Sequence, residues 1–276
     1  MTVRPSLHGS APPLSGSDAV FATDPLTQLI AASIADEVLT DLAWVLSASR
    51  PESELSRLSA RSAERSLAAT VSPVLAAVLA AAQRAETMSG GWFRPIRSPQ
   101  AAAGIPELRF DPETRHLVLP RGTELDLWAV GCAWAAEHIL ERIEQTDPFA
   151  TVAVVVGPAV VTVGAAWEIS EALQGELTVL DPALQRGRRR FGVLQTDEAE
   201  PTSAPPRRRP CWDRIAVAAD DAVRAVALAG ATQRLGPVAP DWIQAVGGEA
   251  ELRSARSVPF RGQRRVRTEQ WAARGL

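Results

Sequence analysis

Residues 124–145 constrain the fold of this chain more than any other segment. Between Leu125 and Ala136, Asp126 is the only residue that is neither apolar nor small. A helix that is apolar on nearly every side packs against neighbours on more than one side. Thr123, with Asp126 three residues later, resembles a capping box and favours a helix start at this point. We therefore expect one long helix at the centre of the core.

The sequence before this segment predicts a layer of helices. Asp24 is a suitable cap for a first helix, and Pro25 fits its first position, where the missing N–H costs nothing. Apolar residues then recur at spacings of three or four and predict one buried stripe, formed by Leu26, Leu29, Ile30, Ile34, Val38, Leu42 and Val45. Two further helices are expected over 51–69 and 73–90. Residues 1–22 have no such periodicity and predict a disordered tail.

Strand patterns dominate the middle of the chain. Residues 107–119 predict a hairpin, because Leu108 and Phe110 on one arm face the same way as Leu117 and Leu119 on the other. Further short strands are expected at 151–156, 160–163, 176–180 and 190–194. These strands would form a small mixed sheet packed on the central helix. The predicted fold class is therefore α+β.

The charges are segregated along the chain. All 29 basic residues are arginine, and lysine is absent. Residues 1–183 hold 12 Arg against 22 acidic residues, a net charge of −10, whereas residues 184–276 hold 17 Arg against 10, a net charge of +7. Residues 196–210 combine prolines and polar residues without an apolar pattern, which is typical of a linker. We predict a body over 23–195 and a separate Arg-rich module over 211–276.

The Arg-rich module has the element order of a winged helix-turn-helix. A helix over 211–229, short helices at 240–246 and 249–256, and a hairpin at 257–268 follow one another. The last two elements would serve as the recognition helix and the wing, and their guanidinium groups suit phosphates. The arginines predicted to contact nucleic acid are Arg253, Arg256, Arg261, Arg264, Arg265 and Arg267. An alternative is that this basic segment docks on an acidic protein surface.

Familiar catalytic motifs are absent from the sequence. It contains no GxGxxG, GxSxG or CxxC motif, and a chain without lysine cannot carry a Walker lysine. His138 precedes Glu141 and Arg142 on the expected central helix. One histidine with one carboxylate is half of a usual metal site and is more typical of a surface ion-pair network. We predict no catalytic residue, metal or cofactor from these motifs.

Trp92 and two nearby arginines form another candidate ligand site, separate from the C-terminal arginines. It follows two glycines and precedes Arg94 and Arg97 in a segment without regular periodicity. The two guanidinium groups beside this aromatic ring suit an anion. We interpret this segment as the border of a small pocket for an anionic ligand.

The main functional prediction is a non-catalytic regulatory or nucleic-acid-associated protein whose C-terminal arginines contact a polyanion, as in DNA binding. The first alternative is a scaffold subunit whose basic third docks on an acidic protein. The second is an enzyme with an Asp/Glu/Arg site in the body.

Residues 1–25 lack the apolar core of a signal peptide, and no run of about 18 apolar residues occurs. We therefore expect a cytoplasmic protein without a membrane segment, and its oligomeric state stays open.

Overall fold

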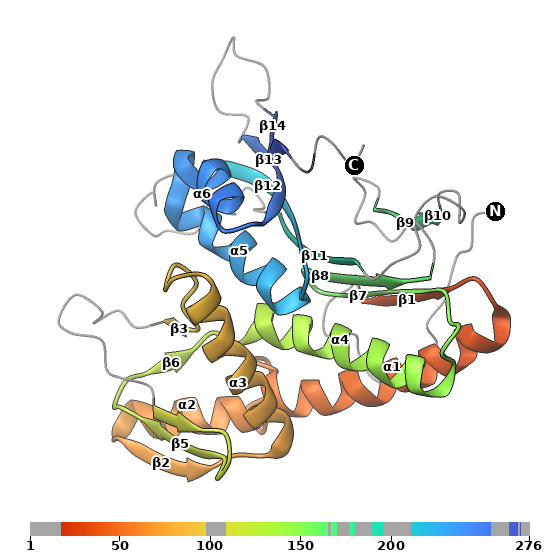
Figure 1. The fold of residues 1–276 in the computed structure, drawn as a ribbon. Helices are drawn as coiled ribbons and strands as arrows, with labels where there is room; N and C mark the ends of the chain where they lie inside the picture. The colour runs from red at the N-terminus through yellow and green to blue at the C-terminus, as the bar shows by residue number, and fades with distance from the viewer. Residues whose placement is uncertain are drawn as a thin grey trace.

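A computed structural model describes residues 18–97, 109–164, 167–169, 177–179, 189–195, 211–254, 265–269 and 271. The largest element is a seven-stranded sheet in which all neighbouring strands are antiparallel (Figure 1). In spatial order its strands are β1 (Ala19–Ala22), β7 (Val152–Val156), β8 (Ala159–Val163), β11 (Arg189–Gln195), β12 (Trp212–Ala219), β13 (Glu249–Ser254) and β14 (Arg265–Arg267).

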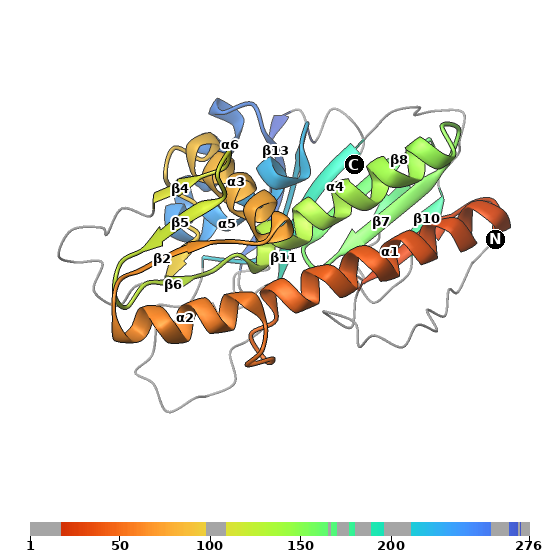
Figure 2. The same ribbon diagram turned by 90° about the horizontal axis from the view of Figure 1, so that it is seen from below.

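Helices cover one face of this sheet. The α-helices of the described residues are α1 (Pro25–Leu46), α2 (Glu54–Glu64), α3 (Pro73–Met88), α4 (Trp128–Thr146), α5 (Ala222–Leu235) and α6 (Ala239–Ala245). Helix α4 packs on β7 and β8, and α5 packs on β11 and β12. Helix α1 runs beside α4 along the sheet (Figure 2), and α3 packs against both α4 and α5.

The predicted central helix is confirmed as α4. Val130, Cys132 and Ile139 are fully buried, and they belong to a core that α4 shares with the large sheet and the other helices. Gly131 faces α1, and a Cβ atom at this position would collide with the side chain of Leu46. The small residue therefore allows α1 and α4 to approach closely.

The predicted helix starts are also confirmed. The Asp24 carboxylate accepts a hydrogen bond from the Thr27 backbone N–H (2.8 Å), and α1 begins with proline. The Ser72 hydroxyl accepts from the Leu75 N–H (3.2 Å), and α3 also begins with proline. In both helices a side-chain oxygen satisfies one of the N–H groups that have no partner within the helix.

The predicted stripe on α1 is only partly correct. Its later members are buried, namely Ile34, Val38, Leu42 and Val45. Leu26 and Leu29 are exposed instead. The reason is the orientation of the first turn, since Thr27 faces inward and its hydroxyl donates to the Asp147 carboxylate (2.8 Å).

Strand β1 corrects the predicted extent of the N-terminal tail, because residues 19–22 form an edge of the large sheet. The outer edge of β1 is capped by one side chain. The Gln28 side-chain carbonyl accepts from the Ala22 N–H (2.7 Å), and its amide group donates to the Val20 carbonyl (2.9 Å). Gln28 thus replaces one peptide group of a neighbouring strand and satisfies this edge.

Within the described residues, three smaller sheets accompany the large one. They contain β2 (Leu67–Thr70), β4 (Arg109–Asp111) and β5 (His116–Leu119) in one sheet, β3 (Ile96–Arg97) and β6 (Glu124–Leu125) in a second, and β9 (Trp167–Ile169) and β10 (Leu177–Val179) in a third. The predicted hairpin is confirmed over its described residues, with Phe110 paired to Leu117. The predicted capping box is wrong, because β6 occupies the start of the segment and Leu127 holds the cap position of α4 without a side-chain hydrogen bond.

The C-terminal region differs most from the prediction. The helix expected over 211–229 is strand β12 followed by α5, and the recognition helix expected over 249–256 is strand β13 over its described part. In β13 the apolar residues Ala250 and Leu252 alternate with charged ones, which is the period of a strand. The predicted linker, 196–210, lies outside the described residues, and the strands on either side of it, β11 and β12, are neighbours.

The predicted α+β fold class is confirmed by the segregation of helices and antiparallel sheets. The small mixed sheet of the prediction is corrected to a large antiparallel one. None of the helices in the described ranges is long and apolar enough to span a bilayer.

Candidate functional site

The helices α3, α4 and α5 meet at a group of charged residues, which we call the α3–α4–α5 junction. Arg84 of α3 lies near Asp221, which precedes α5, with 3.8 Å between its Nη1 atom and the Asp221 Oδ2 atom. Glu137 of α4 accepts a hydrogen bond from the N–H of Ala222, the first residue of α5 (3.1 Å). Residues that are far apart in the sequence therefore meet where α5 begins.

Carboxylates and arginines alternate at the start of α5. Asp221 caps the helix by accepting from the Arg224 N–H (3.1 Å). The Arg224 guanidinium donates to Asp220 (2.9 Å) and to the backbone carbonyl of Val246 (2.5 Å). The Arg84 side chain keeps 60% of its surface exposed and that of Asp221 keeps 34%. The junction therefore presents a guanidinium and a carboxylate to solvent, side by side.

The Trp92 loop, residues 89–95, follows α3 and packs against α5. Gly90 and Gly91 adopt positive φ angles of 59° and 80°, which suit glycine. The Phe93 ring lies against Gly230 of α5, where an added Cβ atom would stand 2.9 Å from the ring. Trp92 itself is 42% exposed. The segment predicted to border an anion pocket is thus placed beside α5, as is the junction.

Three of the six arginines predicted to contact nucleic acid surround one carboxylate, and we call this group the arginine cluster. Glu251 of β13, whose side chain is 10% exposed, accepts from Arg253 (3.1 Å), Arg265 (2.5 Å) and Arg267 (2.7 Å). Burial lowers the pKa of Arg253, and the nearby charges of Arg265 and Arg267 lower it further. Three guanidiniums therefore share one carboxylate at the surface of the sheet, and Arg253 is the most buried of them. The other predicted contacts, Arg256, Arg261 and Arg264, lie outside the described residues.

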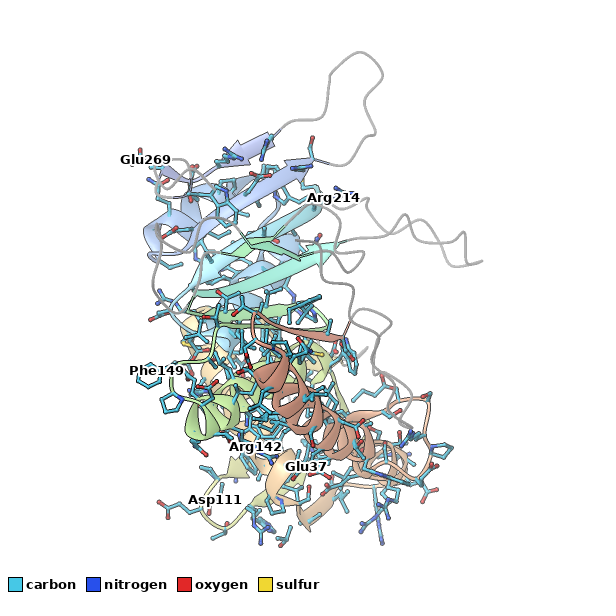
Figure 3. The ribbon with its side chains drawn as sticks, turned by 90° about the vertical axis from the view of Figure 1, so that its right-hand side faces the viewer. Glu37, Asp111, Arg142, Phe149, Arg214 and Glu269 are labelled. Carbon is cyan, nitrogen blue, oxygen red and sulfur yellow. The ribbon has the colours of Figure 1, made fainter. Side chains whose placement is uncertain are left out.

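His138 belongs to a surface ion-pair network. Its ring stacks on Trp134 with 5.1 Å between centroids, and its Nδ1 atom lies 3.9 Å from the Glu141 carboxylate. The neighbouring Arg142 donates to Glu37 of α1 (2.7 Å), and Figure 3 shows these two side chains where α1 and α4 lie together. Within the described ranges no three His, Cys, Asp or Glu residues form a group that could hold a metal ion.

Cys132 is a buried core residue, as its apolar surroundings predict. Burial raises the pKa of its thiol far above the ordinary value, and the nearby Asp18 carboxylate raises it further. Since the thiolate is the nucleophilic form, this cysteine is unsuited to nucleophilic chemistry.

The fold is shared with solved flavin transferases. The chain superimposes on the apo flavinyl transferase ApbE of Pseudomonas stutzeri with a TM-score of 0.67 and 14% identity, covering 93% of this chain and 97% of that one. The flavin transferase ApbE of Vibrio cholerae gives a TM-score of 0.63 at 15% identity, with 91% of each chain covered. The ApbE protein of Thermotoga maritima gives 0.65 at 14% identity, with 92% and 93% covered. The chain matches no known protein-family profile and no curated protein sequence.

These structures overturn the main functional prediction. The solved proteins that share the fold over nearly their whole length include the flavin transferases of Pseudomonas stutzeri and Vibrio cholerae, which contradicts a non-catalytic, DNA-binding regulatory protein. The prediction relied on the run of arginines in the sequence, and the structure places three of them, Arg253, Arg265 and Arg267, around Glu251. The finding favours the second alternative, an enzyme with an Asp/Glu/Arg site.

Sequence reasoning missed the residues of the junction. Asp220 and Asp221 before an apolar run form a signal for a helix start, and reading it would have placed Asp221 as the cap of α5. No comparable signal singles out Arg84 or Glu137. Their role depends on contacts between helices that the sequence does not encode locally.

Proposed function

We propose that this chain is an enzyme that binds a flavin nucleotide and transfers a flavinyl group. The observation that carries the proposal is the shared fold, which extends over 93% of this chain and 97% of the Pseudomonas stutzeri flavinyl transferase. Agreement over the full length of both chains favours a common overall activity over the borrowing of one motif. Because fold alone does not imply function, the proposal also needs a site with suitable chemistry.

The α3–α4–α5 junction supplies groups that such a reaction requires. A flavin nucleotide carries phosphate, and in a chain without lysine the side-chain cations available to bind phosphate are arginines. Arg84 is exposed and lies beside Asp221, which orients its guanidinium. We assign Arg84 to contact with the adenylate-side phosphate of FAD, the one that leaves with AMP.

The carboxylates of the junction suit proton transfer. When a hydroxyl attacks the flavin-side phosphorus of FAD, a new P–O bond forms, the pyrophosphate bond breaks and AMP leaves. The hydroxyl proton must go to a base, and a nearby carboxylate can accept it. Asp221 is the candidate, because its side chain is 34% exposed at the start of α5. Its Oδ1 atom caps the helix, and its Oδ2 atom faces Arg84. Glu137 holds the first N–H of α5 and thereby positions Asp221. The same three helices thus carry the phosphate contact, the base and its support.

Covalent transfer is the direct test of this proposal. The purified full chain would be incubated with FAD and a bacterial protein extract as the pool of acceptors, and covalent flavin would be detected by in-gel fluorescence. We expect fluorescent bands that depend on the active chain and that are lost with Asp221→Asn. Arg57→Gln, an exposed change on α2, serves as the matched control and keeps the bands. Bands that are equally strong without the chain, or none with any flavin nucleotide, contradict the proposal.

A further inference from the structure

We propose that the Trp92 loop is the subsite for the ring end of a phosphate-bearing aromatic ligand, with the ring stacked on Trp92 and the phosphate paired with Arg94. This inference deepens the proposed function and rests on it where it names a flavin nucleotide as the ligand. It assigns ligand contacts to two exposed residues that lie outside the junction itself.

The loop is held rigidly although it lies at the surface. Ser89 is fully buried, and its hydroxyl accepts from the Phe93 N–H (3.0 Å). Backbone bonds from Gly91 to the Glu86 carbonyl (2.8 Å) and from Trp92 to the Ser89 carbonyl (3.2 Å) close the turn. A preformed loop of this kind presents Trp92 without the entropy cost of ordering it on binding.

The ring of Trp92 is available for stacking. Trp44 offers a comparison, because it is also exposed but already has the Arg50 guanidinium above its ring at 5.2 Å. Within the described residues no aromatic or cationic side chain stacks on Trp92 in this way. A flat heterocycle bound there would cover an exposed aromatic surface, which is favourable.

Arg94 supplies the charge that the ring lacks. Its Nε atom donates to the carbonyl of Gly91 (3.3 Å), the residue before Trp92, so the exposed guanidinium lies against the same turn. This hydrogen bond uses Nε and leaves the two terminal amino groups of Arg94 to donate to a phosphate. A ring with a phosphate matches this pair better than either a neutral ring or a free phosphate.

The loop and the junction lie along the same helix pair. Arg84 meets Asp221 just before α5, and Phe93 meets Gly230 nine residues further along. At 1.5 Å per residue these contacts are about 13 Å apart along α5. An extended nucleotide bound along α3 and α5 would therefore contact Trp92 and Arg94 at one end and approach the junction at the other.

Calorimetric titration of the full chain tests this subsite with three probes: FMN, riboflavin and ATP. FMN has both a flavin ring and a phosphate, riboflavin lacks the phosphate, and ATP has phosphates on another ring. We expect Trp92→Ala to weaken FMN binding about tenfold or more. Arg94→Gln is expected to weaken FMN binding but to leave riboflavin binding unchanged. Trp44→Ala and Arg57→Gln are the matched controls and should bind FMN as the wild-type chain does.

The outcomes separate this inference from the proposed function. If FMN binds but Trp92→Ala and Arg94→Gln bind it equally well, the subsite is wrong and flavin binding stands. If ATP binds in a manner that depends on Trp92 and no flavin binds, the subsite holds for another nucleotide and the proposed function fails. If none of the three probes binds to the wild-type chain, both are wrong. Phe93→Leu, which loosens the loop without touching the ligand groups, should reproduce part of the Trp92→Ala loss.

Discussion

The α3–α4–α5 junction and the arginine cluster are both rich in charge, but they use it in opposite ways. In the cluster three guanidiniums surround the nearly buried Glu251, so the charges stabilise the β13–β14 pair. In the junction Arg84 and Asp221 are 3.8 Å apart and open to solvent. Density of charge in the sequence therefore does not locate a functional site. What matters is whether the fold leaves the charged groups accessible and oriented.

Removing the central carboxylate of the cluster should have the largest effect on stability. Glu251→Ala takes away the acceptor that three guanidiniums share. Arg253, the most buried of them, then lacks its partner, and the loss of its charged hydrogen bonds costs about 1.5–3 kcal/mol. Urea denaturation would measure the change in the free energy of unfolding. A loss below about 1 kcal/mol, the range of surface ion pairs, would mean that the cluster is a solvated surface like the junction.

A methyl group at Gly230 should disturb the Trp92 loop. In Gly230→Ala the new Cβ would lie 2.9 Å from the Phe93 ring, and such overpacking costs about 1–3 kcal/mol. Helix propensity favours alanine by about 1 kcal/mol, so a net loss of stability isolates the clash. Thermal unfolding would measure the loss, and Phe93→Leu in the same chain should restore part of it. A stabilised Gly230→Ala variant would show that the loop does not seat on α5.

The link between α4 and α5 should have a smaller effect. Glu137→Ala removes the acceptor for the Ala222 N–H, a change comparable to the loss of a helix cap, at about 1 kcal/mol. Glu137→Gln is the matched control, because its amide carbonyl can still accept this bond. Equal unfolding free energies for the two variants would contradict a role of the hydrogen bond in fixing the start of α5.

The surface pair between α1 and α4 should contribute least, and its contribution should depend on pH. The hydrogen bond and charge of Arg142 lower the pKa of Glu37 from its ordinary value of 4.5. A carboxylate with a lowered pKa in the folded state stabilises the protein above its ordinary pKa, and this contribution is lost as the pH falls through the lowered value. The urea midpoints of the wild-type chain and Glu37→Gln should therefore differ slightly at neutral pH and converge in acid. A difference in urea midpoint that grows as the pH falls would contradict a stabilising ion pair between Glu37 and Arg142.

The sequence predicted best the elements whose signals are local. Asp24 with a following proline marks the start of α1, and the apolar segment around Val130 marks α4 as the core helix. The sequence of β12 is ambiguous. Trp212 and Ile215 have helical spacing and led to the wrong prediction of a helix, whereas Ile215 and Val217 alternate as on a strand. Pairing with β11 and β13, which are distant in sequence, settles this ambiguity in favour of the strand.

The candidate site was harder to predict than the fold. Trp92 and Arg94 were identified because they are neighbours in the sequence, whereas Arg84, Glu137 and Asp221 come from three separate helices. Ion pairing between strands also removed Arg253 and Arg267 from the set of free cations. Both errors have the same physical origin, since contacts between distant segments decide which charged groups stay accessible.

Titration of the full chain with FAD, repeated for one variant of each charged region, tests the central claim most directly. Arg84→Gln removes the exposed guanidinium of the junction, and Arg265→Gln removes the most exposed guanidinium of the arginine cluster. The account predicts that the wild-type chain binds FAD, that Arg84→Gln binds it at least tenfold more weakly, and that Arg265→Gln binds it normally. Loss of binding in Arg265→Gln with normal binding in Arg84→Gln, or no FAD binding by the wild-type chain, would contradict it.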